Sequence, residues 1–183
     1  SLEQDWLEAR GAVFASSRGG LDGAWRLGMR LASRSYPDTT ALDRDTVALE
    51  GSWEHAPLDG PDVWLFHRTE RREVADPAAR PGAWSHWTEG RAAFSAGAGE
   101  AVANLTSEVW RYEREDLTYV NSWRLDTELG YRWGDLLAAQ WQGLLTVEHL
   151  AAGDAPQTYT QVGLRASVES YAEPFSGVVA LEL

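Results

Sequence analysis

The sequence predicts an all-β protein, an antiparallel up-and-down β-barrel of about ten strands that is either complete or part of a larger barrel. Two observations carry this prediction. Apolar and polar residues alternate over stretches of ten or more residues, as strands with one apolar face require. Each stretch ends in a cluster of Gly, Pro, Asp or Asn, such as Gly19-Gly20, and these residues favour turns.

Composition narrows the possible functions. The 183 residues suit one domain, residues 1–183, and neither a linker nor a solenoid repeat divides them. A net charge of −12 argues against a nucleic-acid surface, and the absence of cysteine excludes disulfides, thiolate metal sites and cysteine nucleophiles. No apolar run reaches the roughly eighteen residues of a membrane-spanning helix. Ser1–Trp6 lacks the pattern of a signal peptide, so we expect a removed leader or a start inside a longer protein.

The N-terminal strands are expected as follows. Residues 1–16 hold either a first strand from Trp6 to Ala15 or a short helix, because Ser1–Gln4 also resembles a helix cap. The next strand spans Ala24–Tyr36, with Trp25, Leu27, Met29 and Leu31 on one face and Arg26, Arg30 and Arg34 on the other. In the strand Thr46–His55, Glu50 and Glu54 are placed to face those arginines.

Three further strands are expected in the middle of the chain, at Val63–Glu73, Trp84–Ala96 and Ala101–Tyr112. The clearest alternation follows, over Leu117–Trp133. One face of that strand carries Tyr119, Trp123, Leu125, Leu129, Tyr131 and Trp133, and the other carries Ser122, Arg124, Asp126, Glu128 and Arg132.

The segment Leu136–Ala152 is rich in helix formers but keeps a two-residue period. We favour a strand because Gly134-Asp135 has the composition of a short hairpin turn. A last hairpin is expected from Tyr159–Tyr171 and Phe175–Leu183.

Alternation alone does not separate a membrane barrel from a soluble sandwich. Three features favour the membrane: aromatic residues near strand ends, charges of both signs deep within strands, and strands that approach the roughly nine to eleven residues needed to cross a bilayer. The candidate aromatic belt at the membrane interface comprises Trp53, Trp84, Trp123, Tyr131, Trp133 and Tyr171. The candidate lining of the lumen, either a salt-bridged plug or a channel wall, comprises Arg26, Arg30, Glu50, Glu54, Arg124, Asp126, Glu128, Arg165 and Glu169.

The segments ELGYRWGDLLAAQW and QVGLRASVES make the chain resemble outer-membrane β-barrels as a class. The segment RSYPDTTALDRDT is similar, more weakly, to the C-terminal barrels of exopolysaccharide and surface-lipoprotein export proteins. The likeness covers most of the chain as a pattern and contains no signature motif. Two features depart from these families: Leu183 replaces their aromatic terminus, and these 183 residues contain no helical repeats.

This resemblance implies a non-enzymatic pore or export channel in the outer membrane of a Gram-negative bacterium, with lipid and a polysaccharide or other polar solute as partners. The alternative is a secreted or periplasmic all-β sandwich or jelly roll that binds carbohydrate through exposed tryptophans. The tryptophans considered for that role are Trp64, Trp84, Trp87 and Trp110.

Other chemistry has less support from the sequence. An outer-membrane hydrolase would pair Ser52 with His55 or Ser85 with His86, but adjacent residues point to opposite faces of a strand. Asp126 and Glu128, which share a face, are expected to pair with arginines and not to act on a glycosidic bond. The cluster of Arg68, Arg71 and Arg72 is interpreted as a solvated strand end, with contact to anionic lipid or a polyanion as the alternative. The four scattered histidines predict no metal site, and no cofactor is expected.

Overall fold

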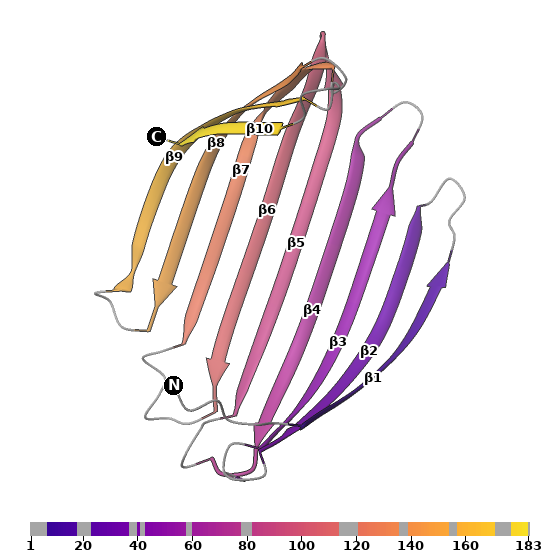
Figure 1. Cartoon of the computed structure of the whole chain (residues 1–183), viewed down its shortest axis with the longest axis vertical. Coiled ribbons are helices and arrows are strands. Elements are labelled where there is room, and N and C mark those ends of the chain that lie inside the picture. The colour runs from indigo at the N-terminus through magenta and orange to yellow at the C-terminus, as the bar shows by residue number, and fades with distance from the viewer. Residues whose placement is uncertain are drawn as a thin grey trace.

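The computed structural model shows one curved antiparallel sheet whose ten strands follow each other in chain order (Figure 1). It describes residues 7–17, 23–36, 40, 43–57, 60–77, 82–113, 121–135, 139–153, 157–170 and 177–182. The strands are β1 (Leu7–Ser17), β2 (Ala24–Ser35), β3 (Arg44–His55), β4 (Asp62–Val74), β5 (Ala83–Ala96), β6 (Gly99–Tyr112), β7 (Ser122–Asp135), β8 (Ala139–Ala152), β9 (Tyr159–Ser170) and β10 (Gly177–Glu182).

The predicted all-β, antiparallel up-and-down arrangement is confirmed. The first element is a strand and not a helix, and the helix-rich composition of Leu136–Ala152 is overridden by pairing of β8 with β7 and β9. Among the described residues, no helix is long and apolar enough to cross a membrane.

One predicted turn is wrong, and one predicted strand start lies outside the described residues. β7 begins at Ser122, and residues 117–120 of the strand expected from Leu117 are not described. The side-chain oxygen of Asn121, just before β7, accepts from the Tyr112 amide at 2.7 Å. The turn expected at Gly134-Asp135 is instead the end of β7, where Gly134 pairs with Gln140. Gly134 has φ +97°, so its sequence signal reflects a backbone distortion at the strand end and not the turn itself.

The expected closed barrel is not seen. Within the described residues, β1 pairs only with β2 and β10 pairs only with β9, so the sheet keeps two edges. Closure requires a hydrogen-bonded partner for each edge, and no described strand supplies one.

Successive strands are displaced along their own direction. One pairing row joins Leu27 of β2, through one residue of each intervening strand, to Thr160 of β9. Eight residues of β2 lie beyond this row on the Ser35 side, but only Tyr159 of β9 lies on that side. The strand ends therefore shift by seven residues over the seven strand-to-strand steps from β2 to β9, which is a stagger of one residue per strand.

The unbroken register divides the side chains between two faces. The apolar face carries the large side chains of β2, β3, β7, β8 and β9, and they lie open: Leu129 is 50 % exposed, Val162 64 % and Leu164 59 %. The opposite, polar face carries most of the arginines and carboxylates. The only buried hydrophobic residues among those described are Ala48, Ala83 and Leu144, so the apolar face does not enclose a dry core.

The β7–β8 hairpin offers a matched test of this backbone. Replacing Gly134 by Ala forces a side chain into the left-handed region and places Cβ 2.3 Å from the Ala139 carbonyl oxygen. Gly134→Ala should therefore lower the free energy of unfolding by about 1–3 kcal/mol. Gly143→Ala meets no atom within 4 Å and should leave stability unchanged or raise it by up to about 1 kcal/mol. Urea unfolding followed by tryptophan fluorescence measures both, and equal shifts in the two variants would contradict the assigned hairpin geometry.

Candidate functional site

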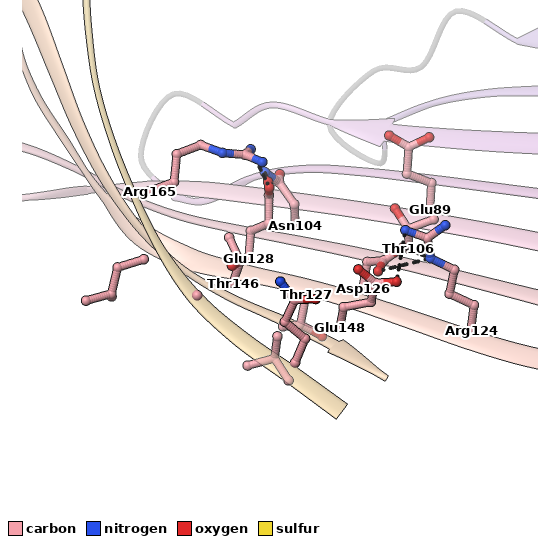
Figure 2. A pocket seen from close by; sticks show the side chains of 14 residues that line it. Glu89, Asn104, Thr106, Arg124, Asp126, Thr127, Glu128, Thr146, Glu148 and Arg165 are labelled. Atoms are coloured by element: carbon pink, nitrogen blue, oxygen red, sulfur yellow. Dashed lines mark hydrogen bonds and ion pairs between the residues drawn. The ribbon is translucent and has the colours of Figure 1, made fainter. Parts of the chain in front are cut away.

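All nine residues predicted to line a lumen lie on the polar face. The register shows this directly, because Arg30 lies opposite Ala48 and Asp126 lies opposite Glu148, both within polar-face rows. The face runs across the whole sheet, and one hollow on it lies over β5–β9 (Figure 2). That hollow has a volume of about 570 Å³ and is lined by Glu89, Asn104, Thr106, Arg124, Asp126, Glu128, Thr146, Glu148, Gln161 and Arg165, among others.

Ion pairs bridge the strands of this cavity. The Arg124 guanidinium lies 3.0 Å from Asp126 on its own strand and 3.3 Å from Glu148 on β8. The Tyr159 hydroxyl, from β9, donates a further hydrogen bond to Glu148. Three adjacent strands are thus tied together by one charged cluster.

A second cluster centres on Glu128. Its carboxylate accepts from the Asn104 amide at 2.9 Å and from Arg165 Nη1 at 3.0 Å, and Figure 2 shows both side chains directed at it. Asn104 lies on β6 and Arg165 on β9, so the Glu128–Arg165 pair crosses over β8 and joins two strands that are not neighbours.

The remaining predicted lining residues are spread over the polar face. Arg30 and Glu50 form a two-point pair, at 2.9 Å and 3.0 Å. The Arg26 guanidinium lies 3.9 Å from the centre of the Phe14 ring. Glu54 lines a separate cavity of about 320 Å³ with Arg91 and Arg132, and Glu169 lies opposite Gln140. The structure therefore brings the nine residues onto one surface but not into one site.

The sequence prediction missed a third cavity of about 430 Å³ over β1–β4, lined by arginines. Two of them, Arg68 and Arg72, were interpreted as a solvated strand end. The pairing instead places both on the polar face, while the intervening Arg71 lies on the apolar face, 5.2 Å from the Trp84 ring. The four-residue spacing of Arg68 and Arg72 could have revealed this, since residues an even number apart share a face.

The apolar face carries the candidate aromatic belt. Trp53, Tyr131 and Trp133 lie towards one end of the strands and Trp84 and Trp123 towards the other, whereas Tyr171 lies outside the described residues. Two aromatic residues that the prediction missed, Trp25 and Trp141, lie directly opposite Trp53 and Trp133 and extend the first group.

The serine–histidine pairs do not form catalytic dyads. Ser52 and Ser85 lie on the polar face, while His55 and His86 lie on the apolar face. His86 instead approaches His67: Thr69 bridges the two, at 3.0 Å and 3.1 Å, and Thr88 contacts His67 at 2.9 Å. No group of three or more metal-ligating side chains occurs among the described residues.

The tryptophans considered for carbohydrate binding also divide between the faces. Trp64, Trp87 and Trp110 lie on the polar face, and Trp84 lies on the apolar face. Arginines lie near two of the polar-face rings: Arg91 is 5.1 Å from the Trp64 ring centre, and Arg72 is 5.4 Å from that of Trp110.

No protein-family model, curated protein or solved structure matches the chain.

The pair that crosses β8 can be tested by a double-mutant cycle. Glu128→Gln, Arg165→Gln and the double variant should give a coupling energy of about 0.5–1 kcal/mol, because both side chains are partly exposed and water screens the pair. The matched pair Glu89–Arg91 lies within one strand, and Arg91 is more exposed, so its coupling should be smaller. Urea unfolding midpoints measure both cycles. A coupling near zero for Glu128–Arg165 would show that this contact does not join β7 to β9.

Proposed function

We propose that the chain is a non-enzymatic outer-membrane β-barrel, a pore or export channel with a charged polar interior. One observation carries the proposal: an apolar face, most extensive over β2–β3 and β7–β9, that has no covering layer of described residues and is backed by a face of paired charges. The proposed compartment, the outer membrane of a Gram-negative bacterium, follows because closed sheets of strands are one of the two ways in which a chain crosses a bilayer.

The apolar face leaves many large hydrophobic side chains exposed. Exposed apolar patches beyond a few hundred Å² mark contact with lipid or another protein. On β7 this face runs from Trp123 through Leu125, Thr127 and Leu129 to Trp133, so aromatic residues flank a centre of two leucines and one threonine. Lipid-facing strands of outer-membrane barrels have this arrangement, because aromatic rings settle at the two interfaces.

The stagger supports closure into a barrel. One residue per strand is a shift of about 3.3 Å for a strand spacing of about 4.8 Å, which tilts the strands by about 35° from the barrel axis. The ten residue steps from Trp123 to Trp133 then span about 27 Å along that axis, close to the apolar band of about 25 Å in membrane barrels. Ten strands alone would close with a backbone radius of about 9 Å, and further strands would widen the lumen.

The polar face suits the interior of such a barrel. Several of its carboxylates are paired with arginines across strands, which partly compensates the charges where water is limited. The proposal is non-enzymatic because the serine–histidine pairs are split between the faces. Lipid on the outside and a polar solute inside, with polysaccharide as one candidate, are the proposed partners.

The alternative, a secreted or periplasmic sandwich that binds carbohydrate, needs a second sheet over the apolar face, and all described strands belong to one sheet. One observation favours sugar contact in either case: Trp64, Trp87 and Trp110 lie among polar groups, where indole rings can stack on sugars. In the proposed barrel these rings would line the lumen.

Membrane residence can be tested with a matched pair of substitutions. Leu129→Arg places a charge at the centre of the apolar face of β7 and should lower folding stability in lipid vesicles by about 2–4 kcal/mol. Thr146→Arg adds the same charge beside Glu128 on the polar face and should change it by less than about 1 kcal/mol. Urea titration in vesicles and co-fractionation with membranes are the measurements. A wild-type protein that is soluble and monodisperse without detergent would refute membrane residence.

Conduction is a separate test of the same proposal. In planar bilayers the wild-type protein should give discrete current steps, and removing the bridge over β8 with Glu128→Gln/Arg165→Gln should raise the step size, because a paired obstruction is lost without a change in net charge. Gly143→Ala, on the apolar face, is the control and should leave the step size unchanged. If the wild type inserts into bilayers and no current steps appear, the protein is a plugged barrel and not a pore.

A further inference from the structure

The cavity over β1–β4 is unusual in its charge. Six arginines, Arg10, Arg30, Arg34, Arg44, Arg68 and Arg72, line it together with only two carboxylates, Glu8 and Glu70. We call it the arginine pocket. It lies towards the end of the sheet where β1 begins and β2 ends, and its lining carries a formal charge of +4, six arginines minus two carboxylates.

Small residues create the hollow. One pairing row runs Arg10, Ala32, Thr46, Arg72, and the next runs Ala12, Arg30, Ala48, Glu70. The short side chains of Ala32 and Thr46 lie at the centre of the first row and that of Ala48 near the centre of the second, and arginines surround them. Guanidinium groups from four strands thus surround a floor of alanine and threonine.

The surface that the pocket presents is basic, because the carboxylates lie beneath the arginines. The side chains of Glu8 and Glu70 are only 12 % and 18 % exposed, whereas those of Arg10 and Arg30 are 71 % and 55 % exposed; Arg72, at 32 %, and Arg34, at 20 %, are more covered. Glu8 is shared between Arg10, at 2.8 Å, and Arg34, at 3.3 Å, so one carboxylate serves two guanidinium groups. A solute entering the hollow meets nitrogen donors before it meets oxygen acceptors.

Three arginines of the pocket are arranged less favourably for the protein alone. Arg68 forms no hydrogen bond or ion pair with the residues that the structure describes. Arg34 lies directly opposite Arg44 on the neighbouring strand, and like charges in that position destabilise a sheet. A bound anion would provide an acceptor for Arg68 and would offset the repulsion between Arg34 and Arg44.

The rest of the polar face has the opposite bias. In β5–β9 it carries seven carboxylates, namely Glu89, Glu100, Glu108, Asp126, Glu128, Glu148 and Glu169, against four arginines, namely Arg91, Arg124, Arg132 and Arg165. In β1–β4 seven arginines face five carboxylates, because Arg26 adds to the pocket and Glu50, Glu54 and Asp62 add to Glu8 and Glu70. Charge is therefore separated between two walls, which draws an anion towards β1–β4.

We propose that the arginine pocket binds a multivalent oxyanion, a solute bearing phosphate or carboxylate groups. Planar guanidinium forks match both groups in two-point contacts, and about 430 Å³ is the size of a small-molecule site. The inference rests on the proposed function in one respect: it names anions as the solutes that the channel accepts. The pocket itself requires only the fold of β1–β4.

Calorimetric titration with inorganic tripolyphosphate tests the pocket directly, with the whole chain in zwitterionic detergent at low salt. Saturable binding is expected, and Arg10→Gln/Arg68→Gln should weaken it at least tenfold. The matched control Arg91→Gln/Arg124→Gln removes the same charge from the polar face outside the pocket and should change affinity less than threefold.

Circular dichroism establishes that each variant is folded. If Arg10→Gln/Arg68→Gln fails to fold, Arg68→Gln alone, which leaves no carboxylate unpaired, should still weaken binding severalfold.

Three results would overturn the pocket: no saturable binding by the wild type, equal weakening by the control, or an unchanged affinity in Arg10→Gln/Arg68→Gln.

A lipid headgroup as the source of the phosphate is tested with vesicles of phosphatidylcholine with and without phosphatidylglycerol. Because the pocket faces away from the apolar side, the pocket variant should bind both vesicles like the wild type. Loss of binding to the anionic vesicles alone would assign these arginines to a membrane surface and overturn a solute site.

The bilayer measurements separate this inference from the proposed function. Tripolyphosphate binding without current steps would leave the pocket standing and refute the pore. Current steps without tripolyphosphate binding would support the pore and refute the pocket.

Discussion

The structure depends on one constraint, an unbroken pairing register from β1 to β10 that keeps the side chains of β1–β9 in the same two faces. A slip of one residue between any two strands would move all apolar side chains of the later strands to the polar face. The row through Leu129 and Leu145 shows the result, because it stays apolar as far as Leu164 on β9. Both faces, and every site on them, exist only because this register holds.

The same register explains why the sheet resembles part of a barrel wall. A stagger of one residue per strand, kept over β2–β9, tilts the strands in one sense, and a tilted sheet with one apolar face curves to bring its edges together. What the described residues lack is a partner for the outer edges of β1 and β10. An unpaired edge exposes a row of amides and carbonyls, which is most costly in lipid. In the proposed barrel, closure within this chain or with additional strands would pair both edges and leave the apolar face against lipid.

The sequence was sufficient for much of the fold and less of the candidate sites. Strand positions and the faces of Trp123, Leu129 and Arg124 follow from alternation within one strand, which is local information. Partners between strands are not local. Glu128 meets Arg165 only because three antiparallel strands adopt one register, and His67 meets His86 only because β4 and β5 pair in theirs. The arginine pocket was missed because its rows depend on four strands, and the alanines that open it have no chemical signature of their own.

Arginine is the only strong base in the chain, since all 16 Lys and Arg residues are arginines, and the polar face makes use of its geometry. Glu8 holds two guanidinium groups, and Arg124 holds two carboxylates, so each network joins strands with few side chains. A lysine ammonium would give point contacts without the planar fork. Over β5–β9 the guanidinium groups are paired with carboxylates, and these pairs stabilise that part of the polar face. Over β1–β4 arginines outnumber carboxylates, so the polar face is more basic at that side of the sheet.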